Sequence, residues 1–162
     1  MTDLTIRPAR ESEVPQIHML IRELAEAEEF PFAVTVTENV LRNSLFGDRP
    51  AAKALLGFSD NQLVGFAVFY ETLAATTSKR GLHLDDLFIR PEFQARGYGR
   101  AFFRYLAEIA KKRDCARFEW WALRTNVHAI RLFQAIGARP MEELLIFRVH
   151  DHSLDRLAGT EA

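Results

Sequence analysis

The chain has 162 residues, a formal net charge of −1 at pH 7, 48% hydrophobic and 27% charged residues. Its length and apolar content predict one domain with a buried core. The near-neutral charge argues against general nucleic-acid binding and against a basic membrane-surface protein. A single cysteine excludes an internal disulfide and fits a reducing compartment. Without a signal-peptide pattern or an apolar run near the ~20 residues of a membrane span, we expect a cytoplasmic protein.

The first expected elements are a strand over residues 4–7 and an amphipathic helix that Ser12 is predicted to cap. The apolar face of this helix is formed by Val14, Ile17, Ile21 and Leu24. Three acidic residues, Glu26, Glu28 and Glu29, follow at its C-terminal end, where the helix dipole disfavours negative charge. They indicate either a solvated acidic turn or a site for a cationic substrate.

A hairpin is expected in the middle of the chain, after a second helix that opens at Thr37 and stops at Gly47. Its strands cover residues 52–58 and 62–71, and Ser-Asp-Asn at 59–61 forms the turn. The second strand is apolar on both faces, which is typical of a central strand. A polar loop over residues 72–80 and a strand over 81–89 follow.

A glycine-containing loop separates that strand from a long amphipathic helix starting near Gly97. Gly97 and Gly99 leave backbone N–H groups unshielded, and the first N–H groups of a helix have no partner inside it. The helix dipole adds partial positive charge. Four arginines lie in the same region: Arg90, Arg96, Arg100 and Arg104. The sequence therefore predicts a phosphate-binding loop here.

The last part of the chain is predicted to hold a strand over 117–123 with Trp120 and Trp121, and a helix capped by Asn126 and closed by Gly137. A final strand is predicted over 143–149. We expect one domain over residues 1–150 and a polar C-terminal tail over 151–162. Alternating strands and helices with hairpins among them predict an α/β fold whose mixed sheet carries helices on both faces.

The spacing Gln-x-x-Gly-x-Gly over residues 94–99 is neither the Rossmann nor the P-loop pattern. It resembles the [RQ]-x-x-G-x-[GA] signature of the GNAT superfamily of N-acetyltransferases, and the similarity covers nearly the whole chain. Residues 21–25, 47–50 and 84–89 are most similar to the diamine (spermidine/spermine) and thialysine N-acetyltransferases. The resemblance implies a mixed, mostly antiparallel central sheet of six or seven strands, a homodimer, acetyl-CoA as acetyl donor and no metal.

The resemblance also implies site residues. The strand that ends at residue 89 would pair with the pantetheine arm, the loop backbone would hold the pyrophosphate, and the last helix would contact the cofactor. The residues implied for acetyl-CoA are Leu87, Phe88, Ile89, Gln94, Ala95, Arg96, Gly97, Tyr98, Gly99, Arg100, Asn126 and Phe133. Glu28 and Asp85 are implied for the cationic substrate.

The chemistry requires a base, because an alkyl ammonium of pKa near ~10.4 must lose a proton before it attacks a thioester. Asp85 and Asp86 are neighbours on a strand, so alternation predicts that they point to opposite faces. The resemblance favours Asp85 as the catalytic residue, with Asp86 as a structural partner. A backbone N–H near Phe88 or Ile89 is expected to polarise the thioester carbonyl.

One position departs from the family pattern. A tyrosine usually protonates the leaving thiolate, and here that position is Phe133, which has no hydroxyl. Water, the helix that starts at Asn126, or another hydroxyl would have to replace it; Tyr98 and Tyr105 are expected to be structural. The sequence therefore predicts an N-acetyltransferase acting on a polyamine or a thialysine-like amino acid. A protein or peptide N-acetyltransferase and a non-catalytic acetyl-CoA-binding module stay as alternatives.

Overall fold

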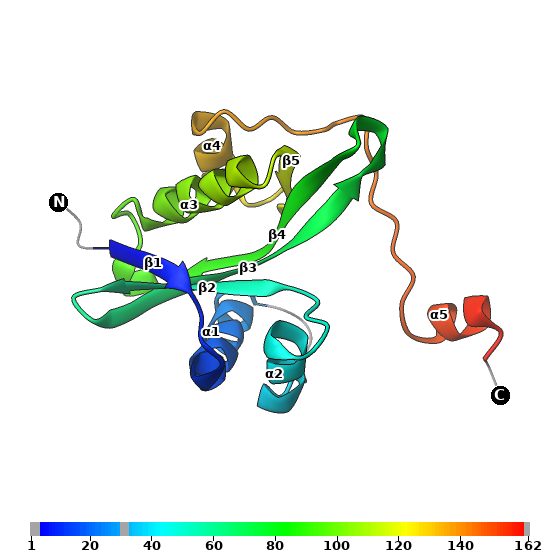
Figure 1. The fold of residues 1–162 in the computed structure, drawn as a ribbon, viewed down its shortest axis with the longest axis horizontal. Helices are drawn as coiled ribbons and strands as arrows, with labels where there is room; N and C mark the ends of the chain where they lie inside the picture. The colour runs from blue at the N-terminus through cyan, green and yellow to red at the C-terminus, as the bar shows by residue number, and fades with distance from the viewer. Residues whose placement is uncertain (1–3, 30–32, 161–162) are drawn as a thin grey trace. The chain divides into compact units, whose positions relative to one another are not determined.

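The computed structural model describes residues 4–29 and 33–160, which fall into two compact units, Met1–Thr125 and Asn126–Ala162. The first unit is a five-stranded sheet with helices on both faces, drawn in Figure 1. Its strands are β1 (Leu4–Pro8), β2 (Lys53–Ser59), β3 (Gln62–Ala74), β4 (Lys79–Ile89) and β5 (Cys115–Trp120). Its helices are α1 (Val14–Ala27), α2 (Glu38–Phe46) and α3 (Tyr98–Lys112), with short 3₁₀ turns at Glu11–Glu13, Ala75–Thr77 and Pro91–Phe93.

The strands follow one another in chain order across the sheet. The pairs from β1 to β4 are antiparallel, and β4 pairs with β5 in parallel. Asp60 and Asn61 both have positive φ, 49° and 62°, as a two-residue hairpin turn requires. The predicted α/β class, the mostly antiparallel mixed sheet and the hairpin are confirmed.

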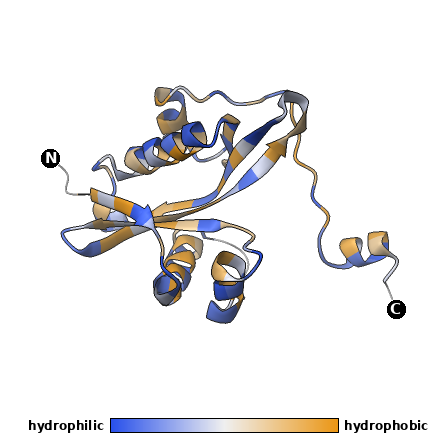
Figure 2. Ribbon diagram, in the orientation of Figure 1, coloured by the Kyte–Doolittle hydropathy of each residue, from blue (hydrophilic) through white to orange (hydrophobic). Residues whose placement is uncertain are grey.

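Two apolar layers hold the helices to the sheet. On one face, α1 and α2 pack against β2, β3 and β4 through a cluster that includes Ile17, Leu20, Phe66 and Phe88. On the other face α3 buries Phe102 and Leu106, both 0% exposed. Each such side chain contributes about 1.5–3 kcal/mol when buried. Figure 2 shows both hydrophobic and hydrophilic colour on α1 and α3, as expected for helices with one apolar side.

Several predicted boundaries are wrong. Ser12 caps no helix, because it lies inside the first 3₁₀ turn. The loop over 72–80 is shorter, since β3 continues past the end of β2 to Ala74 and β4 already starts at Lys79 (Figure 1). β5 starts and ends earlier than 117–123. Thr37 does cap α2, accepting a hydrogen bond from the N–H of Val40 at 3.2 Å.

The second unit contains α4 (Val127–Ala135) and α5 (Asp151–Ala158). Asn126 caps α4 by accepting the N–H of Ala129 at 3.2 Å, and Gly137 has φ +92°, so both predicted ends of this helix are confirmed. The predicted strand over 143–149 is wrong, since these residues belong to no strand. Their side chains favour a strand, but a strand also needs a neighbour for its N–H and C=O groups. The described sheet therefore has five strands, not the six or seven predicted.

Candidate active site

The strands β4 and β5 separate part-way along the sheet. They pair only as far as Leu84 and Trp120, and nothing in the described residues pairs with β4 on that side from Asp85 to Ile89. The N–H of Arg90 donates to the carbonyl of Val64, so the antiparallel alternation directs Phe88 toward β3 and turns Leu87 and Ile89 away from it. The open edge therefore offers the N–H and C=O groups of Leu87 and the N–H of Ile89, whose C=O accepts from Gln94, and not the groups of Phe88.

The predicted phosphate loop lies directly after this edge. Gly97 is the N-cap residue of α3 with φ +83°, and nothing lies within 4 Å of the position that a Cβ would occupy there. The first bond inside the helix runs from Ala101 N–H to Gly97 C=O, so the three preceding N–H groups have no partner in the helix. Ala95 also has positive φ, 59°. This is a backbone shape that can bind an anion.

The side chains of this loop serve mainly to hold its shape. Gln94 Nε2 donates to the Ile89 carbonyl at 2.9 Å, and Arg96 donates to the Glu92 carbonyl at 3.0 Å. Tyr98 is 4% exposed, and its hydroxyl lies 3.0 Å from Ser59 Oγ. The expectation that Tyr98 is structural is thus supported by its contacts, and its backbone N–H stays at the helix start.

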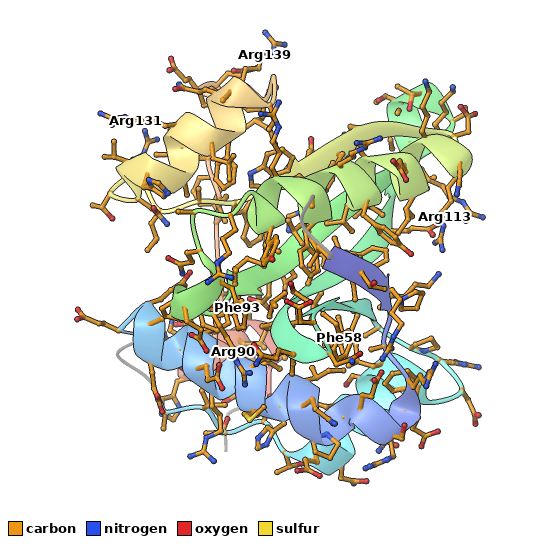
Figure 3. All side chains as sticks on the ribbon, turned by 90° about the vertical axis from the view of Figure 1, so that its left-hand side faces the viewer. Phe58, Arg90, Phe93, Arg113, Arg131 and Arg139 are labelled. Atoms are coloured by element: carbon orange, nitrogen blue, oxygen red, sulfur yellow. The ribbon has the colours of Figure 1, made fainter. Side chains whose placement is uncertain are left out.

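The four arginines of the predicted phosphate region separate into two kinds. Arg90 points to α1, where it binds Glu23, and Figure 3 shows it against that helix. Arg104 pairs with Glu108 one turn along α3, at 3.3 Å. Arg96 and Arg100 are exposed at the loop. Of the four, Arg96 and Arg100 are therefore the ones that add positive charge at the loop.

The acidic residues gather at a β-bulge in β4. Val68 lies opposite Asp86 and Phe69 lies opposite Leu84, so Asp85 has no counterpart on β3. Because paired residues share a face, Asp86 lies on the face of Val68, which packs toward α1 and α2. The same face holds His83, three residues earlier, through its pairing with Tyr70. Strict alternation is broken here, so the predicted opposite faces of Asp85 and Asp86 no longer follow from their being neighbours.

Electrostatics support this grouping. Burial, then the charge of Asp85, and then that of Glu28, raise the pKa of Asp86 from 3.8 to about 6. Burial followed by the charge of Asp85 raises the pKa of Tyr70. Burial also raises the pKa of Glu28, which follows the end of α1. Three carboxyl groups therefore share one region, and Asp86 is the one adjusted toward neutral pH.

An aromatic group adjoins these acids, and sequence reasoning missed it. His83 is 7% exposed, and its ring lies 5.0 Å from the rings of both Tyr70 and Trp121. Alternation along β4 would have found His83 only if the bulge at Asp85 had been recognised. Asn126 and Phe133 belong to the second unit, on α4, and their predicted contacts with the cofactor stay predictions.

Comparison with known proteins is consistent with this geometry. The model of the Acetyltransferase (GNAT) family matches residues 17–138. The chain belongs to this family. It is therefore an acetyl-CoA-dependent N-acetyltransferase by membership. The free N–H groups at Gly97 and the open edge of β4 fit a ligand that carries a diphosphate and an extended amide arm.

Relatives of this acetyltransferase differ in their named substrates. It is 32% identical to the thialysine N-epsilon-acetyltransferase of Mus musculus, over 98% of this chain and 99% of the mouse protein. It is 24% identical to an L-ornithine N5-acetyltransferase of Arabidopsis thaliana, over 94% and 86% of the two chains. An integron cassette protein from V. cholerae shares the fold, with a TM-score of 0.83 at 23% identity over 98% and 99% of the chains.

Residues 4–29 and 33–160 contain no group of three His, Cys, Asp or Glu side chains that could hold a metal ion. Among the same residues, no helix is both long and apolar enough to cross a membrane.

Proposed function

We propose that this enzyme acetylates the primary amine of a small cationic substrate. The observation that carries the proposal is the group of three carboxyl side chains, Glu28, Asp85 and Asp86, next to the open edge of β4. Negative charge in a partly buried region attracts an ammonium group and favours its approach. The named substrates of the relatives, thialysine and L-ornithine, both carry such an amine.

The same acids supply the base. An ammonium must lose a proton before its nitrogen attacks, and the best base has a pKa near the working pH. Asp86, whose pKa is raised to about 6, meets that requirement. Asp85 was favoured from the sequence and stays a candidate, because it adjoins Asp86 in the bulge. We propose that the two act as a coupled pair, one receiving the proton and the other tuning it.

Acetyl-CoA supplies a thioester carbonyl for the amine to attack. Polarising that carbonyl requires a preorganised donor, and a backbone N–H that points out of the sheet can provide it. Leu87 and Ile89 have such N–H groups, whereas that of Phe88 is directed to β3. The first N–H groups of α3, with Arg96 and Arg100, would hold the diphosphate. These roles, and those of Asn126 and Phe133 for the cofactor, are proposals.

A non-catalytic acetyl-CoA sensor is the second candidate, and Phe133 is what favours it, since a phenyl ring cannot protonate a thiolate. A protein or peptide N-acetyltransferase is a further alternative. A homodimer, as the resemblance implies, and a cytoplasmic location are also predictions.

Thiol release from acetyl-CoA, measured against a panel of lysine, ornithine, diamines, polyamines and a lysine-containing peptide, tests the proposal. We expect release that depends on a small amine. Binding of acetyl-CoA without release for any amine would support the sensor, and release with the peptide alone would support the protein acetyltransferase.

A further inference from the structure

The face of the sheet that carries Asp86 and His83 continues onto β5. Glu119 pairs with His83, and Arg117 pairs with Gly81 two residues earlier on β4. Arg117 and Glu119 are two residues apart on a strand, so they share this face. Trp121 follows on the same side and contacts His83. The face therefore presents, in order, carboxylates, aromatic rings, Glu119 and Arg117.

Arg117 of β5 lies opposite a glycine of β4, Gly81. A Cβ built on Gly81 would come within 3.3 Å of Arg117 Cγ and Nε, and within 2.5 Å of Thr72 Oγ1. The absence of a side chain at Gly81 gives the stem of Arg117 its place against the strand. The stem of Arg117 therefore lies against β4, and its side chain belongs to this face of the sheet.

Most N–H donors of the Arg117 guanidinium are available to a ligand. Its Nε lies 3.5 Å from Glu119 Oε2, and both side chains are 47% exposed. Among the described residues, no hydrogen bond is donated by its two terminal nitrogens. A guanidinium has five N–H donors in a fork that matches a carboxylate, so Arg117 can bind one in two-point fashion while Glu119 stays beside it.

This polar order matches one class of amine. A basic α-amino acid has an amine at one end, an apolar stem, and an ammonium with a carboxylate at the other end. Diamines and polyamines have the amine and the stem but no negative end, so they leave Arg117 unused. Gly81 and Asp85 are four residues apart on β4, about 13 Å at the rise of a strand, and the inward reach of the side chains shortens that span.

We propose that Arg117 binds the α-carboxylate of the substrate and Glu119 its α-ammonium, so that the substrate is a basic α-amino acid acetylated at its distal amine. This inference rests on the proposed function, because it concerns the far end of the same site. It assigns substrate choice to a residue distant from the reacting atoms.

The test compares molecules that differ only at the far end. L-Lysine, L-lysinamide and 1,5-diaminopentane share the distal amine, but only lysine has a free carboxylate. For the wild type, kcat/KM should be highest for lysine. Arg117→Gln should lower kcat/KM for lysine about tenfold to hundredfold, the value of a charged hydrogen-bonded pair, and change the other two less than about threefold. Arg117→Lys should keep part of the preference for lysine over lysinamide and diaminopentane, because it retains the positive charge but not the two-point fork.

A matched control is Arg42→Gln on α2, where Arg42 lies 3.4 Å from Glu11 with side chains 39% and 60% exposed. It removes a similar exposed ion pair from another place and should leave all three substrates unchanged. If Arg117→Gln fails to fold, the wild-type comparison of lysine with lysinamide still decides. Equal kcat/KM for lysine, lysinamide and diaminopentane, or equal losses in Arg117→Gln, would overturn the inference and leave amine acetylation standing. Acetylation of none of them would reject the proposed function itself.

Discussion

Arg90 holds Glu23 through two parallel hydrogen bonds, from Nε to Oε2 and from Nη2 to Oε1, each 2.8 Å long. Its Nη1 also donates to the carbonyl of Leu63 at 3.0 Å. The side chains are 19% and 32% exposed, so this pair is largely shielded from water. It joins the residue that follows β4 to α1.

Removing either partner should therefore act on stability more than on cofactor binding. We expect Arg90→Gln or Glu23→Gln to lower the free energy of unfolding by about 1–3 kcal/mol, because each leaves a partly buried group unpaired. The double variant should lose less than the sum. Chemical denaturation measures this, and Arg104→Gln, which breaks a more exposed pair, should cost under about 1 kcal/mol. A loss of acetyl-CoA affinity with no loss of stability would return Arg90 to the phosphate site.

Substitutions at Gly97 can distinguish a loss of backbone freedom from a loss of space for the ligand. Its φ of +83° disfavours other residues, but asparagine tolerates this region better than valine. Since the position of a Cβ is open there, Gly97→Asn should cost little stability and still lower acetyl-CoA affinity by placing a side chain in the diphosphate space. Gly97→Val should lower both. Calorimetric titration and thermal unfolding give the two values, and unchanged affinity in Gly97→Asn would refute the phosphate loop.

The paired acids predict a pH–rate profile. We expect kcat/KM to fall on the acid side with an apparent pKa near 6, as the base at Asp86 becomes protonated. Asp85→Asn should move that limb to lower pH, because it removes a charge that raises the pKa of Asp86. It should also lower turnover at pH 7 more than acetyl-CoA affinity.

Asp86→Asn should lower kcat/KM by at least about a hundredfold above pH 6 and abolish the limb. Profiles of the two variants with the same limb as the wild type would exclude both acids as the base. An intact limb in Asp86→Asn alone would return the role to Asp85.

The parts of this fold that could be predicted are those that local chemistry decides. The glycines at 97 and 99, the proline at 91 and the apolar spacing of α3 define a loop and a helix start without help from the rest of the chain. The turn at Asp60 and Asn61 is predictable for the same reason.

The predictions that failed concern features that depend on residues distant in the sequence. No glycine or proline marks the bulge at Asp85, because it arises from the register of β4 against β3. The face of each acid, and with it the rank of Asp85 and Asp86, could therefore not be read from alternation. Residues 143–149 have the composition of a strand, but only a neighbouring strand would make them one. Phe147 is 88% exposed in this segment.

Adding a hydroxyl group at position 133 tests how the leaving thiolate is protonated. Phe133→Tyr supplies the hydroxyl that is usual in the family at this position. If proton delivery to the thiolate limits turnover, kcat should rise several-fold while KM for the amine stays the same. Phe133→Leu is the control, since it changes the ring without adding a donor, and it should not raise kcat. An unchanged kcat in Phe133→Tyr would assign the proton to water or to another group.

Asp86 should also weaken the fold at neutral pH. Its pKa is raised from 3.8 to about 6, so the folded protein holds the proton more tightly than the unfolded chain. Well below pH 3.8 both states are protonated and no stability is lost. As the pH rises from 3.8 to about 6 the unfolded chain ionises while the folded protein keeps its proton, so stability falls by up to about 3 kcal/mol in total for two pKa units. Asp86→Asn should therefore be close to the wild type in stability at pH 4 and about 1–3 kcal/mol more stable at pH 8.

Denaturation at both pH values measures this difference in stability, with the exposed Asp48→Asn as a control that should show no such difference. Equal stability at pH 8 would mean that the carboxylate of Asp86 is well solvated, which would also remove the reason to prefer it as the base.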